Sequence, residues 1–341
     1  MKIKTGLLAY GASGKLFHAP FIEAHHNYEL VGAWERSNQN IEHDYPKTVS
    51  FNTFEAILNS DAELIVVNTP IDTHYEFTKK VLEAGKHALV EKAFTTTSQE
   101  AEELHKLAQK NNVKLCVYQN RRYDSDFTTV KKVLDEQHLG DIVEAEIRFE
   151  RYNPQLSAKA WKENGNPGTG LLMDLGSHII DQALVLFGLP KKLFADVRKT
   201  RDNSKIDDYF DILLFYPEKR VRLKASLLVK ELAPSYVLHG KKGSFLKHRG
   251  DIQEDQLKLG KKPNRADWGT EPNELDGLLV THNLKGIYPT LAGNYLHFYD
   301  DLYEAISKDK KVPATALEAF NTTRIIELAK ESSQNQKVVL V

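Results

Sequence analysis

The sequence has one cysteine, almost no net charge and no long apolar run. Cys116 cannot form a disulfide within the chain and lies in the apolar run 113–118, which indicates a buried thiol in a reducing compartment. The 46 Lys and Arg residues balance 47 Asp and Glu residues. No long-range field therefore draws the protein to nucleic acid or to anionic lipid.

No apolar run approaches the roughly 20 residues that span a membrane. Residues 1–9 enter an apolar strand pattern at once, without the charged lead, apolar stretch and cleavage site of a secretion signal. We therefore expect a cytoplasmic globular protein. Its length of 341 residues suits two domains of ordinary size.

The first 120 residues alternate short apolar runs with amphipathic patterns of helical spacing. The strand-like runs are partly β-branched and lie at 3–9, 28–34, 64–68, 87–90 and 114–118. The helical patterns between them lie at 54–58, 73–84 and 98–111. This alternation means right-handed crossovers, so we predict a doubly wound parallel sheet and an α/β fold.

Beyond about residue 123 the pattern changes to runs of strands. Helical patterns lie at 127–136 and 171–187, and strand-like segments lie at 142–152, 192–198, 209–216, 221–229, 236–239 and 244–246. Strands without helices between them indicate a large, mainly antiparallel open sheet with helices on one face. We expect a long irregular excursion at 247–290, which is rich in charge, Gly and Pro, and two final helices at 294–307 and 315–333.

A turn of the kind that binds phosphates follows the first strand. Ala9-Tyr10-Gly11-Ala12-Ser13-Gly14 is a glycine-poor version of G-x-G-x-x-G, with alanine at the first glycine. Gly11 would let the backbone approach a pyrophosphate, and Gly14 would let the helix pack closely on its strand. The alternative is an ordinary strand-to-helix turn. The position in the first crossover favours the nucleotide, so we predict cofactor contacts at Tyr10, Gly11, Ala12, Ser13 and Gly14, and a negative φ at Ala9.

The second strand ends at Glu35-Arg36-Ser37, about 20 residues further on, where a dinucleotide fold reads the adenine ribose. Glu35 could accept hydrogen bonds from both ribose hydroxyls, which suits NAD. Arg36 and Ser37 could bind an extra ribose phosphate, which suits NADP. The alternative is a charged loop facing water. Because an arginine would offset the repulsion between the carboxylate and a phosphate, we slightly prefer NADP.

Polar residues also follow the later strands, at the sheet edge where ligands bind. We predict further cofactor contacts at Asn68, Thr69, Pro70, His74, Glu91 and Gln119. His74 could equally be a capping or packing histidine. We predict substrate contacts at Asn120, Arg121 and Tyr123, although this polar segment could be merely a linker, and at Trp161, which could stack on a sugar or simply pack.

One polar stripe interrupts the otherwise apolar helical pattern at 171–187. Asp174 and His178 stand four residues apart on one face, and Asp181 follows three residues later. A buried polar stripe costs free energy unless it is paired. Asp174 and His178 therefore either pair with each other or face a ligand.

These motifs, in this order, resemble the glucose–fructose oxidoreductase/inositol dehydrogenase (Gfo/Idh/MocA) family. The likeness is greatest to its NADP-dependent scyllo-inositol dehydrogenase group and runs essentially end to end. It rests on Gly11-x-x-Gly14, Glu91-Lys92, residues 118–122 and Asp174-Leu175-Gly176-Ser177-His178, with Phe17-His18-Ala19-Pro20, Asp207-Asp208-Tyr209 and Gly293-Asn294-Tyr295.

The resemblance implies a Rossmann domain over residues 1–122 and a substrate-binding and oligomerisation domain over 123–341, with the last helix packing back on the first domain. It implies an NAD(P)-dependent dehydrogenase or reductase acting on a CH–OH group of a polyol or sugar-like substrate. It also implies a homodimer or homotetramer formed through the C-terminal sheet, and no metal.

Three catalytic roles follow from the resemblance. Lys92 orients the reacting oxygen and stabilises its developing charge. His178 is the general acid/base, since an imidazole with an ordinary pKa near 6.5 can take a hydroxyl proton at neutral pH. Asp174 stabilises the imidazolium.

The chain departs from the family at Ala93, which follows Lys92 where the family usually has proline. If the family proline is cis, Ala93 must either form a cis bond, which costs roughly 3 kcal/mol, or reset the loop. Two other functions stay open: a reductase of the same fold for a different carbonyl substrate, and a non-catalytic nucleotide-binding regulatory protein. Retention of Lys92, Asp174 and His178 argues against the regulatory protein.

Overall fold

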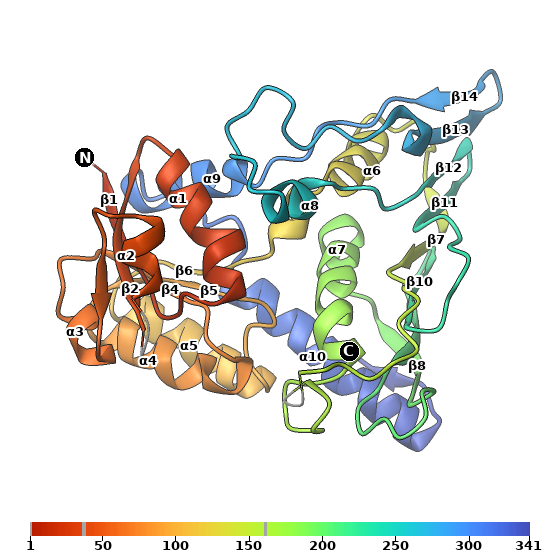
Figure 1. The fold of residues 1–341 in the computed structure, drawn as a ribbon. Helices are drawn as coiled ribbons and strands as arrows, with labels where there is room; N and C mark the ends of the chain where they lie inside the picture. Colours follow the sequence, from red (N-terminus) through yellow and green to blue (C-terminus); the bar gives the residue numbers. More distant parts are fainter. Residues whose placement is uncertain (1, 36–38, 160–161) are drawn as a thin grey trace. The chain divides into compact units, whose positions relative to one another are not determined.

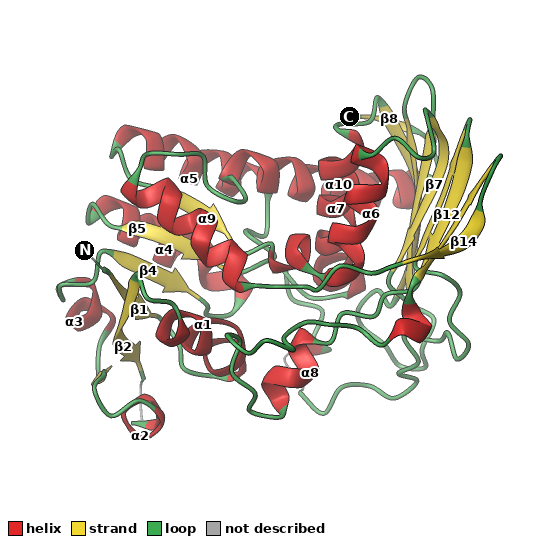
Figure 2. Ribbon diagram, turned by 90° about the horizontal axis from the view of Figure 1, so that it is seen from above, coloured by secondary structure: helices red, strands yellow, loops and turns green. Residues whose placement is uncertain are grey.

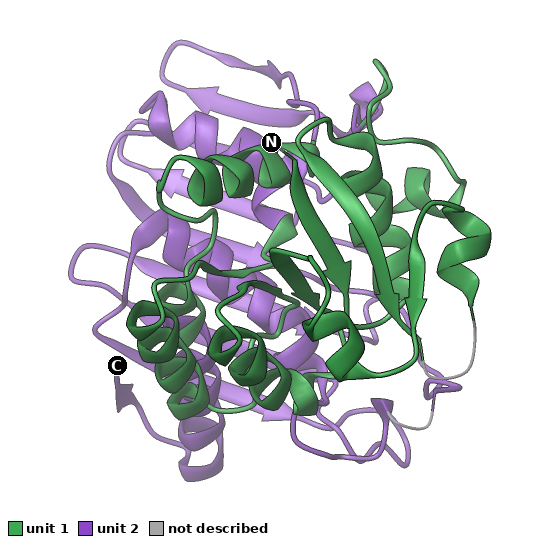
Figure 3. Ribbon diagram, turned by 90° about the vertical axis from the view of Figure 1, so that its left-hand side faces the viewer, with its two compact units in different colours: residues 1–120, 253–268, 294–320 green, residues 121–252, 269–293, 321–341 purple. Residues whose placement is uncertain are grey.

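The computed structural model describes residues 2–35, 39–159 and 162–341, and the chain forms two compact units (Figure 1; Figure 3). Unit 1 contains residues 1–120, 253–268 and 294–320, and unit 2 contains residues 121–252, 269–293 and 321–341. Helix α10 (Ala316–Asn335) contributes residues to both units. Each unit has its own sheet, and the predicted α/β class is confirmed.

Unit 1 is built on a six-stranded, wholly parallel sheet in the order β3-β2-β1-β4-β5-β6. Its strands are β1 (Ile3–Leu7), β2 (Tyr28–Trp34), β3 (Val49–Phe51), β4 (Leu64–Val67), β5 (His87–Val90) and β6 (Leu115–Val117). All four residues of β4 are buried, as expected for a central strand covered on both faces. The predicted doubly wound sheet is confirmed, although the three-residue β3 was not predicted.

The helices of unit 1 lie between its strands, except α8 (Gln253–Lys258) and α9 (Leu296–Ser307), which come from later segments of the chain. Those between the strands are η1 (Gly14–His18), α1 (Ala19–Ala24), α2 (Asn40–Asp44), α3 (Phe54–Leu58), η2 (Ile71–Thr73), α4 (His74–Glu83) and α5 (Ser98–Lys110). A core on one side of the sheet takes Val81 and Leu82 from α4, Leu104 from α5, and Ala316 and Ala319 from α10. A continuous helix covers residues 12–24, but its η1 portion is a π-helical turn.

Gly14 is where this helix lies closest to the sheet. A Cβ atom on Gly14 would lie 2.5 Å from the carbonyl oxygen of Ala9 and 3.1 Å from Nδ2 of Asn68. A Cβ atom on Gly11, in contrast, would meet nothing within 4 Å. The two glycines of the motif therefore do different things: Gly14 permits close packing, and Gly11 leaves open space beside the turn.

Unit 2 is built on a nine-stranded sheet in the order β14-β13-β12-β11-β7-β10-β9-β8-β15. The strands are β7 (Ile142–Arg148), β8 (Lys192–Arg198), β9 (Tyr209–Phe215), β10 (Arg220–Ser226), β11 (Tyr236–Gly240), β12 (Gly243–Lys247), β13 (Gly277–Thr281), β14 (Lys285–Tyr288) and β15 (Val339–Leu340). Among the strands that the structure describes, only β7 and β10 of this sheet pair in parallel, so the predicted mainly antiparallel sheet is confirmed.

The helices of unit 2 lie on one face of this sheet (Figure 2). They are α6 (Ser125–Asp135), the π-helical turn η5 (Leu172–Gly176), α7 (Ser177–Phe187) and the C-terminal part of α10, with the short 3-10 turn η6 (Asn273–Leu275). Another 3-10 turn, η3 (Asn120–Tyr123), lies at the boundary between the units. Within the described ranges, no helix is long and apolar enough to cross a membrane.

The register of unit 2 separates its two faces into rows of paired residues. One buried row crosses seven strands through Leu193, Leu214, Val221, Ala145, Leu238, Phe245 and Leu279. The next row crosses eight strands on the opposite face through Phe194, Leu213, Arg222, Glu146, Val237, Leu246, Leu278 and Ile287. Because neighbouring residues of a strand point to opposite faces, the second row belongs to the face without helices.

The irregular excursion predicted for residues 247–290 is wrong in two places: its first half contains the short helix α8, and its second half contains two strands. Strands β13 and β14 form a hairpin there and extend the sheet at its edge. Strand β13 is itself apolar, but it is only five residues long, and Lys285 and Gly286 interrupt the apolar character of β14. The register of the hairpin comes from pairing with β12, a tertiary contact that the local sequence does not encode.

We predict that Gly14→Ala lowers the free energy of unfolding by about 1–3 kcal/mol, because the added methyl group would overlap the backbone of Ala9. Gly11→Ala is the matched control and should change stability by less than about 0.5 kcal/mol. Urea unfolding of the protein without ligand measures both. Equal stability of the two variants would contradict the proposed packing role of Gly14.

Candidate functional site

The turn after β1 is held by one amide side chain from the end of β4. The backbone N–H of Ala9 donates to Oδ1 of Asn68 at 2.9 Å, and Nδ2 of Asn68 donates to the carbonyl oxygen of Ala9 at 2.7 Å. Ala9 is not among the described non-glycine residues with positive φ, in agreement with the prediction. The alanine is thus accommodated without a left-handed backbone, and Asn68 fixes the turn instead of reaching outward.

The carboxylate of Glu91 joins the same turn to the end of β5. Its Oε1 accepts hydrogen bonds from Oγ of Ser13 at 2.5 Å and from Nε2 of His18 at 3.0 Å. Its Oε2 accepts the backbone N–H of Lys92 at 3.2 Å. The Lys92–Ala93 peptide bond is cis, which is the first of the two alternatives that the replacement of proline left open.

His74 joins the segments that follow β4 and β5. It is buried, and Nε2 lies 2.8 Å from the carbonyl oxygen of Thr69 while Nδ1 lies 3.0 Å from that of Ala93. Burial lowers the pKa of His74, although these carbonyl groups and the charge of Glu91 oppose the shift. The contacts favour the packing histidine that the sequence left as an alternative. Pro70 precedes η2, in which Oγ1 of Thr73 lies 2.7 Å from Oγ1 of Thr69.

Glu35 faces the start of α2. The backbone N–H groups of Asn40 and Ile41 donate to its two oxygens at 3.2 and 3.0 Å, and Oγ of Ser50 donates to Oε2 at 3.3 Å. The carboxylate thus stabilises a helix N-terminus. Arg36 and Ser37, which we predicted to bind the ribose phosphate, lie outside the described residues.

The remaining predicted residues of unit 1 follow the same edge of the sheet. The hydroxyl of Tyr10 donates to Oδ2 of Asp44 at 2.9 Å, so this side chain is directed to α2. Gln119 and Asn120 are buried directly after β6. Because the six strands are parallel, the turn at 10–14, the segments at 68–74 and 91–94, and Gln119 all lie at the carboxyl ends of strands. Unit 1 therefore brings together most of the predicted cofactor residues and Lys92.

The polar stripe of Asp174, His178 and Asp181 lies on η5 and α7 in unit 2. Asp174 is exposed within the π-helical turn, and His178 is buried in the first turn of α7. Further along, Arg122 binds both oxygens of Asp181 at 2.8 and 2.6 Å, and Nε2 of Gln182 donates to the carbonyl oxygen of Arg121 at 3.0 Å. The C-terminal part of the stripe is thus paired within the protein, as buried polar groups require.

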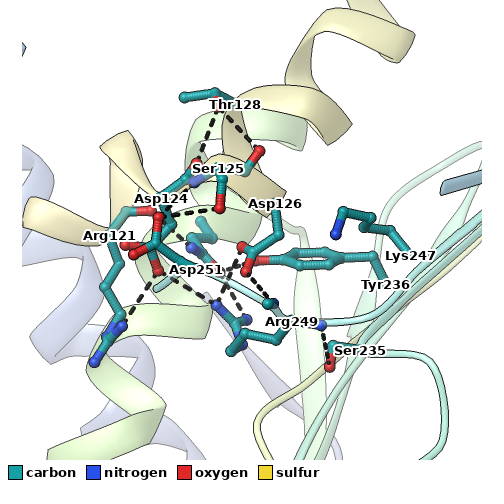
Figure 4. Close-up of polar contacts among 12 residues, drawn as sticks. Arg121, Asp124, Ser125, Asp126, Thr128, Ser235, Tyr236, Lys247, Arg249 and Asp251 are labelled. Atoms are coloured by element: carbon teal, nitrogen blue, oxygen red, sulfur yellow. Dashed lines mark hydrogen bonds and ion pairs between the residues drawn. The ribbon is translucent and has the colours of Figure 1, made fainter. Parts of the chain in front are cut away.

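Arg121, which we predicted to bind substrate, lies at the edge of a buried ionic cluster (Figure 4). Four carboxyl groups and three cationic side chains form it: Asp124, Asp126, Asp251 and Glu271 with Arg121, Lys247 and Arg249. Nη1 of Arg121 donates to Oδ2 of Asp124 at 3.3 Å, and Nζ of Lys247 donates to Oε2 of Glu271 at 2.6 Å.

The cluster attaches two points of the segment after β12, Asp251 and Glu271, to the start of α6. Ser125 donates its backbone N–H to Oδ2 of Asp251 at 2.8 Å, and its hydroxyl is hydrogen-bonded to Asp251 and Glu271. Burial, together with the charges of Asp251 and Asp126, raises the pKa of Asp124 well above its ordinary value of 3.8 despite Arg121 and Arg249. Arg121 is therefore engaged in the fold of unit 2. Trp161 lies outside the described residues.

One residue of the network around Lys92 was absent from the predicted site. His18 is completely buried and lies in the π-helical turn η1, a feature that is frequent at functional sites. The sequence signal was the segment Phe17-His18-Ala19-Pro20, which carried the family resemblance but received no role. Within the described ranges, no group of three or more His, Cys, Asp or Glu side chains could hold a metal ion.

Comparisons with known proteins match both units to one family. Residues 3–119 match the model for the oxidoreductase family, NAD-binding Rossmann fold, and residues 131–341 match that for the oxidoreductase family, C-terminal alpha/beta domain, both labelled GFO_IDH_MocA.

Similar proteins extend the match along the whole chain. The Bacillus subtilis scyllo-inositol 2-dehydrogenase (NADP(+)) IolW is 39% identical, over 99% of this chain and 96% of its own. Inositol 2-dehydrogenase of Rhizobium meliloti is 28% identical, over 55% and 56% of the two chains. A solved Bacillus subtilis structure described as an oxidoreductase, yvaA, is 38% identical, with a TM-score of 0.96 and 100% and 98% coverage.

We predict that Asp124→Asn raises the free energy of unfolding at pH 7 by about 1 kcal/mol or more. When the folded-state pKa of an acid is raised, stability decreases as the pH rises above the unfolded value, here near 3.8, until the folded pKa is reached. The amide removes this loss, so the variant should gain most on the alkaline side. Urea unfolding at pH 5 and pH 8 measures the change.

Asp126→Asn is the matched control for this experiment. Asp126 is equally buried, but its oxygens accept the hydroxyl of Tyr236 at 3.1 Å and the N–H of Gly250 at 3.1 Å. Loss of one acceptor should lower stability by about 1–3 kcal/mol. If both variants lost the same stability at both pH values, the assigned role of Asp124 would be wrong.

Proposed function

Because the chain belongs to the Gfo/Idh/MocA oxidoreductase family, whose first domain binds NAD, we propose that it is an NADP-dependent dehydrogenase of an inositol-type polyol or a related sugar-like substrate. The observation that carries the proposal is that a chain aligned throughout with IolW contains both Lys92 and the pair Asp174 and His178. In unit 1 the backbone N–H of Lys92 donates to Glu91, whose other oxygen accepts Ser13 of the turn at residues 10–14. In unit 2 Asp174 and His178 lie four residues apart on η5 and α7. The cytoplasmic location expected from the sequence stays a prediction.

The turn at 10–14 fits a dinucleotide. The open space beside Gly11 would let the backbone approach a pyrophosphate, and the start of the helix at residue 12 provides N–H groups toward it. The nicotinamide, when bound, supplies the hydride acceptor for the alcohol or the hydride donor for the ketone. We assign the cofactor phosphates to Gly11, Ala12 and Ser13.

Three side chains are proposed to perform the acid–base work. In the oxidative direction the C–H bond gives up a hydride while His178 takes the hydroxyl proton, so a ketone forms and the proton remains on the imidazole. Lys92 donates a hydrogen bond to the reacting oxygen and stabilises its negative charge. Asp174 stabilises the protonated imidazole. In the reductive direction His178 returns the proton.

The preference for NADP is supported by the contacts of Glu35. A carboxylate that reads NAD must accept the two ribose hydroxyls, but both oxygens of Glu35 already accept N–H groups from the start of α2. The N–H groups that point at this carboxylate also offset part of its repulsion of a 2′-phosphate. We therefore assign the phosphate to Arg36 and Ser37, in keeping with the cofactor in the name of IolW.

We predict that the protein oxidises inositol isomers with NADP at least tenfold more efficiently than with NAD, and that His178→Ala and Lys92→Ala each lower kcat/KM about 100-fold or more. Steady-state formation of NADPH with a panel of polyols measures turnover, and fluorescence titration with NADPH measures cofactor binding. The affinity for NADPH should stay within about threefold in both variants.

His282→Ala, at an exposed histidine in the β13–β14 turn, is the control and should retain full activity. If NADPH bound but neither catalytic variant lowered turnover, the regulatory protein would be the better assignment. Turnover of other carbonyl compounds, with no polyol active, would favour the alternative reductase.

The open face of the unit 2 sheet supports a further proposal, that the chain forms a homodimer or homotetramer through this face. Its row of residues is apolar at both ends, with Phe194 and Leu213 at one end and Val237, Leu246 and Leu278 at the other. Arg222 in the middle pairs with Asp211 at 2.9 Å. An apolar face of this width is typical of an interface between protein chains.

We predict that sedimentation velocity gives a mass of two or four chains of 38.8 kDa. Leu278→Glu, which introduces charge into the row, should shift the protein to single chains. Leu259→Glu, at an exposed leucine of unit 1, is the control and should leave the mass unchanged. A wild-type protein that sediments as a single chain at micromolar concentration would refute the assembly.

A further inference from the structure

Glu91 is a buried carboxylate that the proposed reaction does not use. It directly follows β5, and its two oxygens divide their hydrogen bonds between different segments. Oε1 accepts Ser13 and His18 from the phosphate-binding turn and the helix after it, and Oε2 accepts the backbone N–H of Lys92. One carboxylate thus joins the phosphate-binding turn to the backbone of the catalytic lysine.

His18 is itself fixed on its other side. Its Nδ1 lies 2.9 Å from the hydroxyl of Tyr299, which donates to the carbonyl oxygen of Phe17 at 3.2 Å. The hydroxyl of Tyr118 donates to the same carbonyl at 2.9 Å, and the rings of His18 and Tyr118 are 4.6 Å apart. With no exposed surface, His18 has one orientation, in which Nε2 points to Glu91.

The carboxylate stays ionised in this setting. Burial alone would raise its pKa, but the hydrogen bonds and charge of His18, the hydroxyl of Ser13 and the charge of Lys92 together hold the pKa of Glu91 below its ordinary value. An ionised acceptor makes stronger hydrogen bonds than a neutral one. The hydrogen bond from the backbone N–H of Lys92 to Oε2 of Glu91 therefore restrains the backbone at residue 92.

We propose that Glu91 is a positioning residue that sets the backbone of Lys92 relative to the phosphate-binding turn, and that His18 holds Glu91 in place. The inference rests on the proposed function, because Lys92 matters only if it meets the reacting oxygen. It assigns Glu91 to the protein scaffold rather than to direct contact with the cofactor. Since a displacement of about 1 Å can cost roughly 100-fold in rate, loosening this network should affect the chemical step more than binding.

Two substitutions of His18 separate its hydrogen bond from its packing. His18→Gln can place an amide nitrogen near the position of Nε2 and so retain the donor to Glu91, whereas His18→Leu fills the space without a donor. His25→Leu is the matched control. His25 is also buried in unit 1, and its Nε2 lies 2.8 Å from a carboxylate oxygen, that of Asp300.

The first readout does not depend on activity. Hydrogen exchange of the Lys92 amide, followed by NMR in the protein without cofactor, should be about tenfold faster in His18→Leu, near wild type in His18→Gln and unchanged in His25→Leu. The second readout is kinetic. In His18→Leu, kcat with the active polyol should fall about 10- to 100-fold while the Kd for NADPH stays within about threefold, and His18→Gln should recover most of the loss.

Unchanged exchange of the Lys92 amide in His18→Leu would overturn the inference, whatever the activity. So would an equal loss of kcat and of NADPH affinity, since that pattern belongs to general damage of the turn. If exchange responds as expected but the wild-type protein oxidises no polyol, the positional link stands and the proposed function fails.

Discussion

Two hydrogen bonds between the side chain of Asn68 and the backbone of Ala9 are the interaction on which the rest of unit 1 depends. They join the ends of β1 and β4, the two central strands, where the direction of strand order reverses and ligands bind in such sheets. With Ala9 held, Gly14 can approach its carbonyl oxygen, and Ser13 comes within reach of Glu91. The turn at residues 10–14 and the segment that carries Lys92 thus form one hydrogen-bonded structure.

Much of this arrangement could be predicted from the sequence. The alternation of apolar runs and helical patterns predicted the parallel sheet, because the spacing of apolar residues in a strand or a helix is a local property of the sequence. Parallel strands place their carboxyl ends together, so the polar residues after each strand had to gather at one edge. The packing role predicted for Gly14 agrees with the structure, since only the absence of a Cβ atom allows its contact with Ala9.

The parts that could not be predicted depend on tertiary partners. A glutamate after a second strand suggests a ribose contact, but Glu35 binds the start of α2, whose position the local pattern did not reveal. His18 received no role from the sequence, because its partners Glu91 and Tyr299 are 73 and 281 positions away. The β13–β14 hairpin was read as irregular for the same reason. Sequence spacing also could not tell Asp181, which is paired with Arg122, from Asp174 and His178, to which we assign the proposed acid–base chemistry.

The hydroxyl and N–H of Ser125 bind the two ends of the segment between Asp251 and Glu271. This segment leaves unit 2, supplies residues 253–268 to unit 1, and returns to the same serine. Because the entropy of closing a loop grows only slowly with its length, residues inserted between the two anchors add little to the free energy of folding. The chain therefore has a place where relatives can gain or lose length, and so diversify, while both cores remain as they are.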